Sequence, residues 1–250
     1  MELISSQNSP FECILFDLDD TLYDGEIGIH GFLKKNIEDF LSIKCKVSPE
    51  KAFSLRSEFF CSHGSSLAAL LALGYDIHPD EYHSYVHGKL PYELIQPDTS
   101  LLHLLRSIHQ TKILFTNSDR EHAKKALMRL GIDENIFERI ICFETLNPHL
   151  FSEDPLSPNM DQIVVLKPSP SAFHAAIRIS GYDPHRMLFV DDSEKNVVAG
   201  KSLGLNTALV GKKVMKCEDA DYLLEGIMNL REEVPEIWKM NNWSTTSVRA

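Results

Sequence analysis

Four short apolar runs stand out along the chain, and each stops at a polar residue. They cover residues 13–16, 112–115, 163–166 and 187–190. Apolar runs of this length, bounded by polar or turn-forming residues, are typical of buried strands. From residue 99 onward such runs alternate with helical patterns, which predicts βαβ units and a parallel sheet. The pattern therefore predicts an α/β fold, with a doubly wound parallel sheet as a Rossmann-like core.

The segment between the first two runs has helical spacing instead. Apolar residues recur on one face over residues 32–41, at Phe32, Leu33, Ile37, Phe40 and Leu41. Ser48 followed by Pro49 has the form of a helix start. Two further helices are predicted near residues 67–73 and 79–87. No strand is expected in this segment, which predicts an all-helical insertion.

These patterns divide the chain into parts. We expect an α/β core formed by residues 1–23 and 96–237, a helical cap over residues 24–95, and a flexible tail over residues 238–250. Residues 146–162 are rich in Pro, Asp, Asn and Ser and predict a long exposed loop.

Three helices of the core are predicted to begin beside the polar ends of the runs. Ser118 opens a capping-box pattern, Ser169 precedes Pro170, and Ser193 is placed to cap a helix that ends near Gly204. Helix N-termini direct free backbone N–H groups outward. This arrangement predicts an anion site where the strands end.

The polar residues that follow the runs have complementary chemistry. The first run is followed by Asp17, Asp19 and Thr21, and the third by Lys167. The second run is followed by Thr116, Asn117 and Ser118, and the fourth by Asp191, Asp192 and Ser193. Because ligands bind at the carboxyl ends of parallel strands, these groups are expected to meet. Each has a structural alternative, such as a turn, a cap or a solvated charge. Together they predict Mg²⁺-dependent phosphoryl transfer through an aspartyl-phosphate.

Composition narrows the class of partner. The chain has 250 residues and a net charge of −11, which argues against a nucleic-acid polymer because phosphate-backbone binding needs clustered Lys and Arg. Its five cysteines lack paired spacing, so a reducing compartment is expected. The first ten residues lack the features of a signal or transit peptide, and no apolar run is long enough to span a membrane. We expect a cytoplasmic protein, or a nuclear one, acting on a small phosphorylated metabolite; the sequence leaves its oligomeric state open.

The ordered motifs resemble a known family. Asp17-x-Asp19-x-Thr21, then Thr116-Asn117, then Lys167-Pro168, then Asp191-Asp192-Ser193-x-x-Asn196 is similar to the four-motif signature of the haloacid dehalogenase-like hydrolases. A further likeness is to their pyrimidine 5'-nucleotidase branch. It lies in residues 16–23, in Leu90-Pro91-Tyr92 before Pro97-Asp98, and in Phe115-Thr116-Asn117 followed by Leu130-Gly131-Ile132. The family's dehalogenases lack the second acid, so Asp19 favours a phosphatase.

The resemblance implies a role for each motif. Asp17 would attack phosphorus, and Asp19 would protonate the leaving oxygen and then activate water. Thr116, Asn117 and Ser118 would contact the phosphate, and Lys167 would offset charge on it. Mg²⁺ would be held by Asp17, the carbonyl of Asp19, Asp192, and Asp191 directly or through water. Thr21, Ser193 and Asn196 would support these groups.

Substrate choice would depend on the cap. Arg56, His63, Ser65 and Ser66 lie near Gly64, where a ligand could approach closely. We expect Ser65 and Ser66 to bind substrate. Pyrimidine nucleoside 5'-monophosphates are the predicted substrates, with sugar phosphates or other small phosphorylated metabolites as an alternative. A protein-interaction role with a secondary phosphatase site is a third hypothesis.

Overall fold

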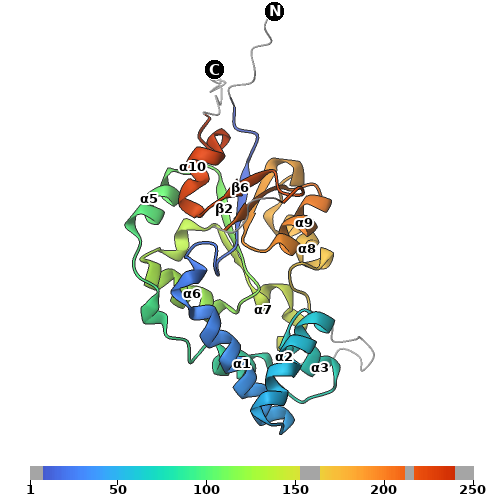
Figure 1. The fold of residues 1–250 in the computed structure, drawn as a ribbon. Coiled ribbons are helices and arrows are strands. Elements are labelled where there is room, and N and C mark those ends of the chain that lie inside the picture. The colour runs from blue at the N-terminus through green and yellow to red at the C-terminus, as the bar shows by residue number, and fades with distance from the viewer. Residues whose placement is uncertain (1–7, 153–163, 212–216, 240–250) are drawn as a thin grey trace, which may run out of the picture.

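The computed structural model describes residues 8–152, 164–211 and 217–239. Its centre is a six-stranded parallel sheet with the order β3-β2-β1-β4-β5-β6 (Figure 1). The strands are β1 (Cys13–Phe16), β2 (Thr111–Phe115), β3 (Arg139–Ile141), β4 (Met187–Asp191), β5 (Asn206–Val210) and β6 (Tyr222–Leu224). The predicted α/β fold with a parallel sheet is confirmed.

Three of the four apolar runs are strands, but the third is not. Val164, Val165 and Leu166 have no partner strand, and Ile163 lies outside the described residues. The backbone N–H and C=O of Val165 bond instead to the side-chain amide of Asn147, at 2.6 and 3.0 Å. The side-chain amide of Asn147 thus takes the place of the hydrogen bonds to a neighbouring strand that the apolar run predicted. Three strands were not predicted, because β3, β5 and β6 are short or interrupted by polar residues.

Helices cover both faces of the sheet. Ile14 and Phe16 of β1 pack into one cluster with α5 (Thr99–Ser107), α6 (Arg120–Leu130) and α10 (Leu230–Glu233). Cys13 and Leu15 face the other side and pack with α8 (Pro170–Ser180). On that second side α9 (Glu194–Ser202) lies against β4 and β5. The alternation of side chains along a strand thus gives the sheet two buried faces.

The helical insertion follows β1 and lies at the end of the molecule opposite the termini (Figure 1). It contains α1 (Ile29–Cys45), α2 (Pro49–His63), α3 (Ser66–Ala72) and α4 (Pro79–Val86). Ser48 caps α2 as predicted, accepting from the N–H of Lys51 at 3.4 Å. Phe40 and Leu41 are buried in the insertion's core, whereas Phe32 is 48% exposed and does not belong to the predicted apolar face.

Two of the predicted helix caps differ in the structure. The cap of α6 is Asp119, which accepts from the N–H of His122 at 2.9 Å, because the Ser118 hydroxyl bonds elsewhere. Ser193 precedes α9 without a side-chain cap bond. Ser169 caps α8 as predicted.

Parts of the predicted loop and tail lie among the described residues. The chain from residue 143 forms α7 (Phe143–Leu146) and a 3₁₀ turn, Pro148–Phe151, while the rest of the predicted loop from residue 153 lies outside the described residues. Trp238, assigned to the tail, ends another 3₁₀ turn and its indole N–H donates to Ser107 Oγ at 3.0 Å. Residues 240–250 are outside the described part. Across the described ranges, no helix is both long and apolar enough to cross a membrane.

Candidate active site

The predicted motifs meet at the carboxyl ends of β1, β2 and β4. Strand β1 is central and pairs with β2 on one side and β4 on the other, so chain connections diverge here. This is the position at which open α/β sheets bind ligands. A cavity of about 530 Å³ opens between these strand ends and the helical insertion. Asp17, Asp19, Thr116, Lys167 and Asp192 line its sheet side.

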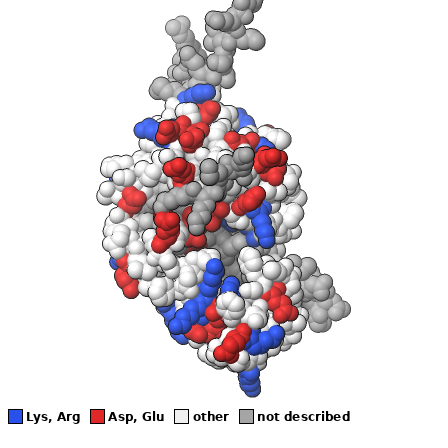
Figure 2. All heavy atoms as spheres, viewed as in Figure 1, with Lys and Arg blue, Asp and Glu red and all other residues white. Residues whose placement is uncertain are grey.

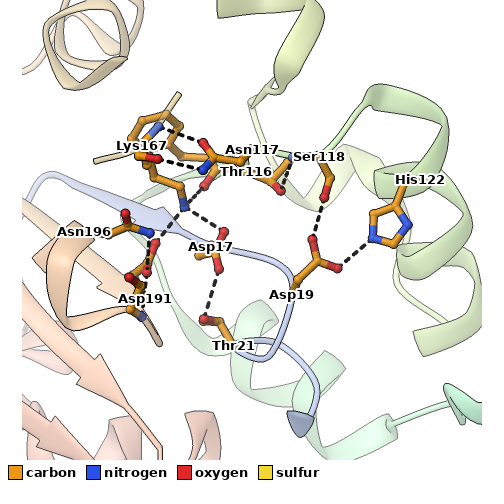
Figure 3. A network of polar contacts seen from close by, with 12 residues as sticks. Asp17, Asp19, Thr21, Thr116, Asn117, Ser118, His122, Lys167, Asp191 and Asn196 are labelled. Carbon is orange, nitrogen blue, oxygen red and sulfur yellow. Dashed lines mark hydrogen bonds and ion pairs between the residues drawn. The ribbon is translucent and has the colours of Figure 1, made fainter. Parts of the chain in front are cut away.

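Lys167 joins the ends of three strands (Figure 3). Its ammonium group donates to Asp17 Oδ1, Asp191 Oδ2 and the carbonyl of Phe115, each at 2.7 Å. The Lys167 side chain is only 1% exposed. Three short bonds satisfy all three donors of the ammonium group, which fixes the cation between the two carboxylates.

Carboxylate oxygens of Asp17, Asp191 and Asp192 gather beside this lysine. One oxygen from each lies within 4.8 Å of the others. Even with Lys167, this group carries an excess of negative charge in a largely buried place. Hard divalent cations prefer such oxygen ligands, so the three side chains fit a Mg²⁺ ion.

The titration of these groups reflects the same crowding. Burial raises the pKa of Asp17 well above its ordinary value; Lys167 opposes this, while Asp191 and Asp192 add to it. Burial and the neighbouring Asp191 raise the pKa of Asp192 to about 7. Lys167 loses hydration on burial, but Asp17 and Asp191 more than compensate and raise its pKa. The lysine therefore stays charged, and its single positive charge does not balance the three neighbouring carboxylates.

Two of the predicted supporting residues hold Asp191. The backbone N–H of Ser193 and the amide of Asn196 both donate to Asp191 Oδ1 at 2.9 Å. Thr21 donates to Asp17 Oδ2 at 3.3 Å. The loop after β4 and the turn after β1 thus orient the carboxylates that face each other.

Asp19 turns away from this cluster (Figure 3). It accepts hydrogen bonds from Ser118 Oγ at 2.8 Å, His122 Nε2 at 2.6 Å and the Tyr23 hydroxyl. Burial alone would raise its pKa, but His122, Tyr23 and Ser118 together lower it well below its ordinary value. Asp17 and Asp19 therefore have opposite environments, which is a common arrangement for separate acid–base roles.

The three residues after β2 are brought to the site, but two have partners that were not predicted. The Asn117 amide bonds the backbone of Lys167, donating to its carbonyl at 2.9 Å and accepting from its N–H at 2.8 Å. The Ser118 hydroxyl donates to Asp19. Thr116 Oγ1 accepts from the N–H of Ser118 at 3.0 Å and keeps its own hydrogen for another acceptor. The side chains of Asn117 and Ser118, which the sequence assigned to phosphate, thus position neighbouring catalytic candidates.

The insertion contributes the opposite wall of the cavity. Arg56, Ser65 and Ser66 line it, whereas His63 is not among the lining residues. Ser65 caps α3, accepting from the N–H of Ala68 at 3.0 Å. Arg56 forms an ion pair with Glu38 at 2.8 Å. These contacts give Ser65 and Arg56 a structural role in addition to their place in the cavity.

Comparison with known families agrees with this geometry. Residues 11–204 match the family described as haloacid dehalogenase-like hydrolase. The chain belongs to the haloacid dehalogenase-like hydrolases. Among curated relatives, pyrophosphatase PpaX of Halalkalibacterium halodurans is 23% identical over 160 residues, which cover 61% of this chain and 65% of that protein. The matched part thus spans less than two thirds of this relative's length.

Solved structures share the fold of this hydrolase. A haloacid dehalogenase-like phosphatase from Thermococcus onnurineus superposes with a TM-score of 0.58 at 21% identity, covering 89% of this chain and 97% of the other. The haloacid dehalogenase-like hydrolase YfnB from Bacillus subtilis, solved with magnesium bound, gives a TM-score of 0.56 at 16% identity, with 89% and 97% covered. At these identities the likeness establishes the fold and not the substrate.

Several residues of this hydrolase's site were not predicted. Tyr23 and His122 contact Asp19, Asn147 holds Val165, and His87 pairs with Asp119 at the cap of α6. One signal was present in the sequence: His122 lies in the first turn of a predicted helix that starts at a motif, where side chains point back toward the strand end. The other contacts depend on the tertiary fold.

Proposed function

We propose that this hydrolase is a Mg²⁺-dependent phosphatase that cleaves small phosphate monoesters through an aspartyl-phosphate on Asp17. The observation that carries this proposal is the position of Asp17, at the end of β1, between Lys167 at 2.7 Å and the separately oriented Asp19, in one cavity. A nucleophile, a fixed cation and a second acid are the groups that the reaction requires.

In the first step, Asp17 attacks phosphorus and the bond to the leaving oxygen breaks. Lys167 offsets negative charge on Asp17 and on the transferring group, because its ammonium is buried and cannot move away. We assign the Thr116 hydroxyl and the backbone N–H of Asn117 as donors to phosphate oxygens. The amide of Asn117 instead keeps Lys167 in place.

In the same step Asp19 gives a proton to the leaving oxygen, and it then takes one from the water that hydrolyses the intermediate. In the structure its three donors favour the ionised form, which suits the second role. A phosphate dianion entering beside it would raise its pKa, since like charges disfavour ionisation, and this prepares the first role.

Asp17, Asp192 and the backbone carbonyl of Asp19 would hold Mg²⁺. Asp191 already accepts three bonds from Lys167, Ser193 and Asn196, so it would support the ion less directly than the other two carboxylates. Bound Mg²⁺ would polarise the phosphate oxygens and reduce repulsion between the two anions that react.

For the leaving group we propose a nucleoside, with pyrimidine 5'-monophosphates as the first candidates. We take residues 24–95 as the cap that selects it, with Ser65 and Ser66 as polar contacts. The cap side of the cavity includes Leu33, Phe60 and His83, a mostly apolar wall suited to a flat base. Figure 2 shows Lys and Arg side chains beside Asp and Glu side chains over this part of the molecule. On the cap side of the cavity the lining includes Lys34 and Arg56, which favours an anionic substrate.

The apolar cap side of the cavity also distinguishes between the alternative substrate classes. Pyrophosphate, the substrate that the name of the relative PpaX states, is small and charged and would leave the apolar wall without contacts. Sugar phosphates would need several polar partners for their hydroxyl groups, and Ser65, Ser66 and Arg56 on the cap wall could supply some of them. Sugar phosphates are the second candidate class on that basis.

Phosphate release from a substrate panel tests the proposal. The panel contains CMP, UMP, AMP, glucose 6-phosphate, glycerol 3-phosphate, pyrophosphate and p-nitrophenyl phosphate, each with Mg²⁺ and with a chelator. We expect Mg²⁺-dependent turnover, highest kcat/KM for pyrimidine nucleotides, and none with Asp17→Asn. If no compound is hydrolysed, the phosphatase assignment is wrong and a protein-interaction role gains support. If pyrophosphate or a sugar phosphate ranks first, the substrate class is wrong.

A further inference from the structure

The side chain of Asp19 is held by two buried residues that lie outside the four-motif signature. His122 reaches it from the first turn of α6, and Tyr23 reaches it from the turn after β1. Both donate to the same atom, Oδ1, whereas the Ser118 hydroxyl donates to Oδ2 at 2.8 Å. The two oxygens of Asp19 therefore differ in what they can still accept.

A carboxylate offers about four lone-pair positions, two on each oxygen. On Asp19, Oδ1 already accepts two hydrogen bonds and Oδ2 accepts one. One position on Oδ2 is left for a proton. We infer that His122 is a positioning residue: together with Tyr23 it occupies Oδ1 of Asp19 and leaves Oδ2 as the atom that exchanges the proton with the leaving oxygen.

His122 is itself held so that it cannot turn away. Its side chain is 2% exposed. Its second ring nitrogen, Nδ1, lies 2.8 Å from the Tyr92 hydroxyl. The ring of His87, from the end of α4, lies on its other side with ring centroids 4.5 Å apart, and His87 is paired in turn with Asp119. Both nitrogens are thus used and the ring plane is fixed.

The inference deepens the proposed function and rests on it, because it concerns the acid of the same reaction. A support that only stabilised the fold would affect all substrates equally. A support that aligns Oδ2 matters in proportion to how much the leaving oxygen needs a proton. The dependence on the leaving group therefore separates positioning from stability.

The experiment measures kcat/KM for three aryl phosphates whose leaving groups need increasing assistance: 2,4-dinitrophenyl, p-nitrophenyl and phenyl phosphate. The parameter kcat/KM reports transfer to Asp17 and excludes the later hydrolysis, in which Asp19 acts as base. For His122→Phe we expect a loss of about 10- to 100-fold on phenyl phosphate and less than about threefold on dinitrophenyl phosphate. His122→Gln, whose amide can still donate to Oδ1, should recover part of the loss.

Two further variants keep the test decisive. Tyr23→Phe removes the other donor to Oδ1 without touching α6, and it should show the same leaving-group pattern even if His122→Phe does not fold. His103→Gln, at an exposed position on α5, is the matched control and should equal the wild type. Equal losses on all three compounds in His122→Phe and Tyr23→Phe, or no loss on phenyl phosphate, overturn the inference. Failure of the proposed function has a different signature, since the wild type would then hydrolyse none of the three.

Discussion

Replacing Lys167 by Met removes a cation that bonds both Asp17 and Asp191. Methionine fills similar space, so the main change is electrostatic. The lysine side chain is 1% exposed and its ammonium group makes three bonds at 2.7 Å, so its loss leaves two buried carboxylates facing each other without compensation. Removing one partner of a buried ion pair costs about 3–5 kcal/mol. We expect a loss of that size in the free energy of unfolding at pH 7.5 without Mg²⁺.

The stability deficit of Lys167→Met relative to the wild type should decrease as pH falls. Without Lys167, a buried carboxyl with a raised pKa binds a proton more tightly in the folded than in the unfolded chain. A group of this kind contributes stability that is fully present below its unfolded pKa and is lost as pH rises through its folded pKa. One such proton changes the free energy of unfolding by about 1.4 kcal/mol per pH unit. Between pH 7.5 and 5.5 the deficit should therefore fall by as much as about 3 kcal/mol.

Urea unfolding followed by circular dichroism, with a chelator present, measures both quantities. Lys125→Met is the matched control: its ammonium lies 3.4 Å from Glu121 on the surface of α6, where an ion pair contributes about 0.3–0.5 kcal/mol. A Lys167→Met variant within 1 kcal/mol of the wild type at pH 7.5 would refute the reasoning, using the roughly 1 kcal/mol typical of an ordinary substitution as the threshold. A deficit that stays constant down to pH 5.5 would refute the electrostatic explanation.

Three other variants or conditions test neighbouring parts of the site. Asp17→Asn should abolish phosphate release while circular dichroism stays unchanged, because the amide keeps the shape of the side chain but cannot attack phosphorus; residual turnover near the wild-type level would contradict the assignment. Mg²⁺ affinity, measured by calorimetry, should weaken as pH falls below about 7. The pKa of Asp192 is raised to about 7, so protons then compete with the metal for this carboxylate. An affinity that is constant from pH 8 to 5.5 would contradict this ligand set. Ser65→Ala should lower the free energy of unfolding by about 1 kcal/mol, as expected for a lost helix cap. The double variant with Ser66→Ala should alter the ranking of substrates by kcat/KM, while the rate on p-nitrophenyl phosphate barely changes. An unchanged ranking would mean that this segment does not select the substrate.

The sequence predicted the parts of the site that local pattern controls. Apolar runs ending in Asp17, Thr116 and Asp191 are strands β1, β2 and β4, and their ends meet as parallel pairing requires. The position of Lys167 was predicted although its run is not a strand. A four-residue apolar segment does not reveal whether its backbone will bond to a strand or to side chains.

The parts that were missed depend on distant pairs of residues. Asp19 and His122 are 103 positions apart, and Asn117 and Lys167 are 50 apart. The place of His122 in the first turn of a helix directs its side chain toward the strand ends, but it does not identify Asp19 as the partner. The local sequence around Asn117 does not indicate its partner either. For the same reason Ser118 and Asn117 were assigned to phosphate: their chemistry suits it, but neighbours that only the fold brings close already use their side chains.

The pair of asparagines around the third run has a consequence for engineering. Asn117 holds the backbone of Lys167 at both its N–H and its carbonyl, and Asn147 does the same for Val165. The position of Lys167 is therefore set by contacts with residues that closely follow β2 and α7. A redesign of this segment that keeps Asn117 and Asn147 would therefore keep the backbone contacts that align the reactive lysine.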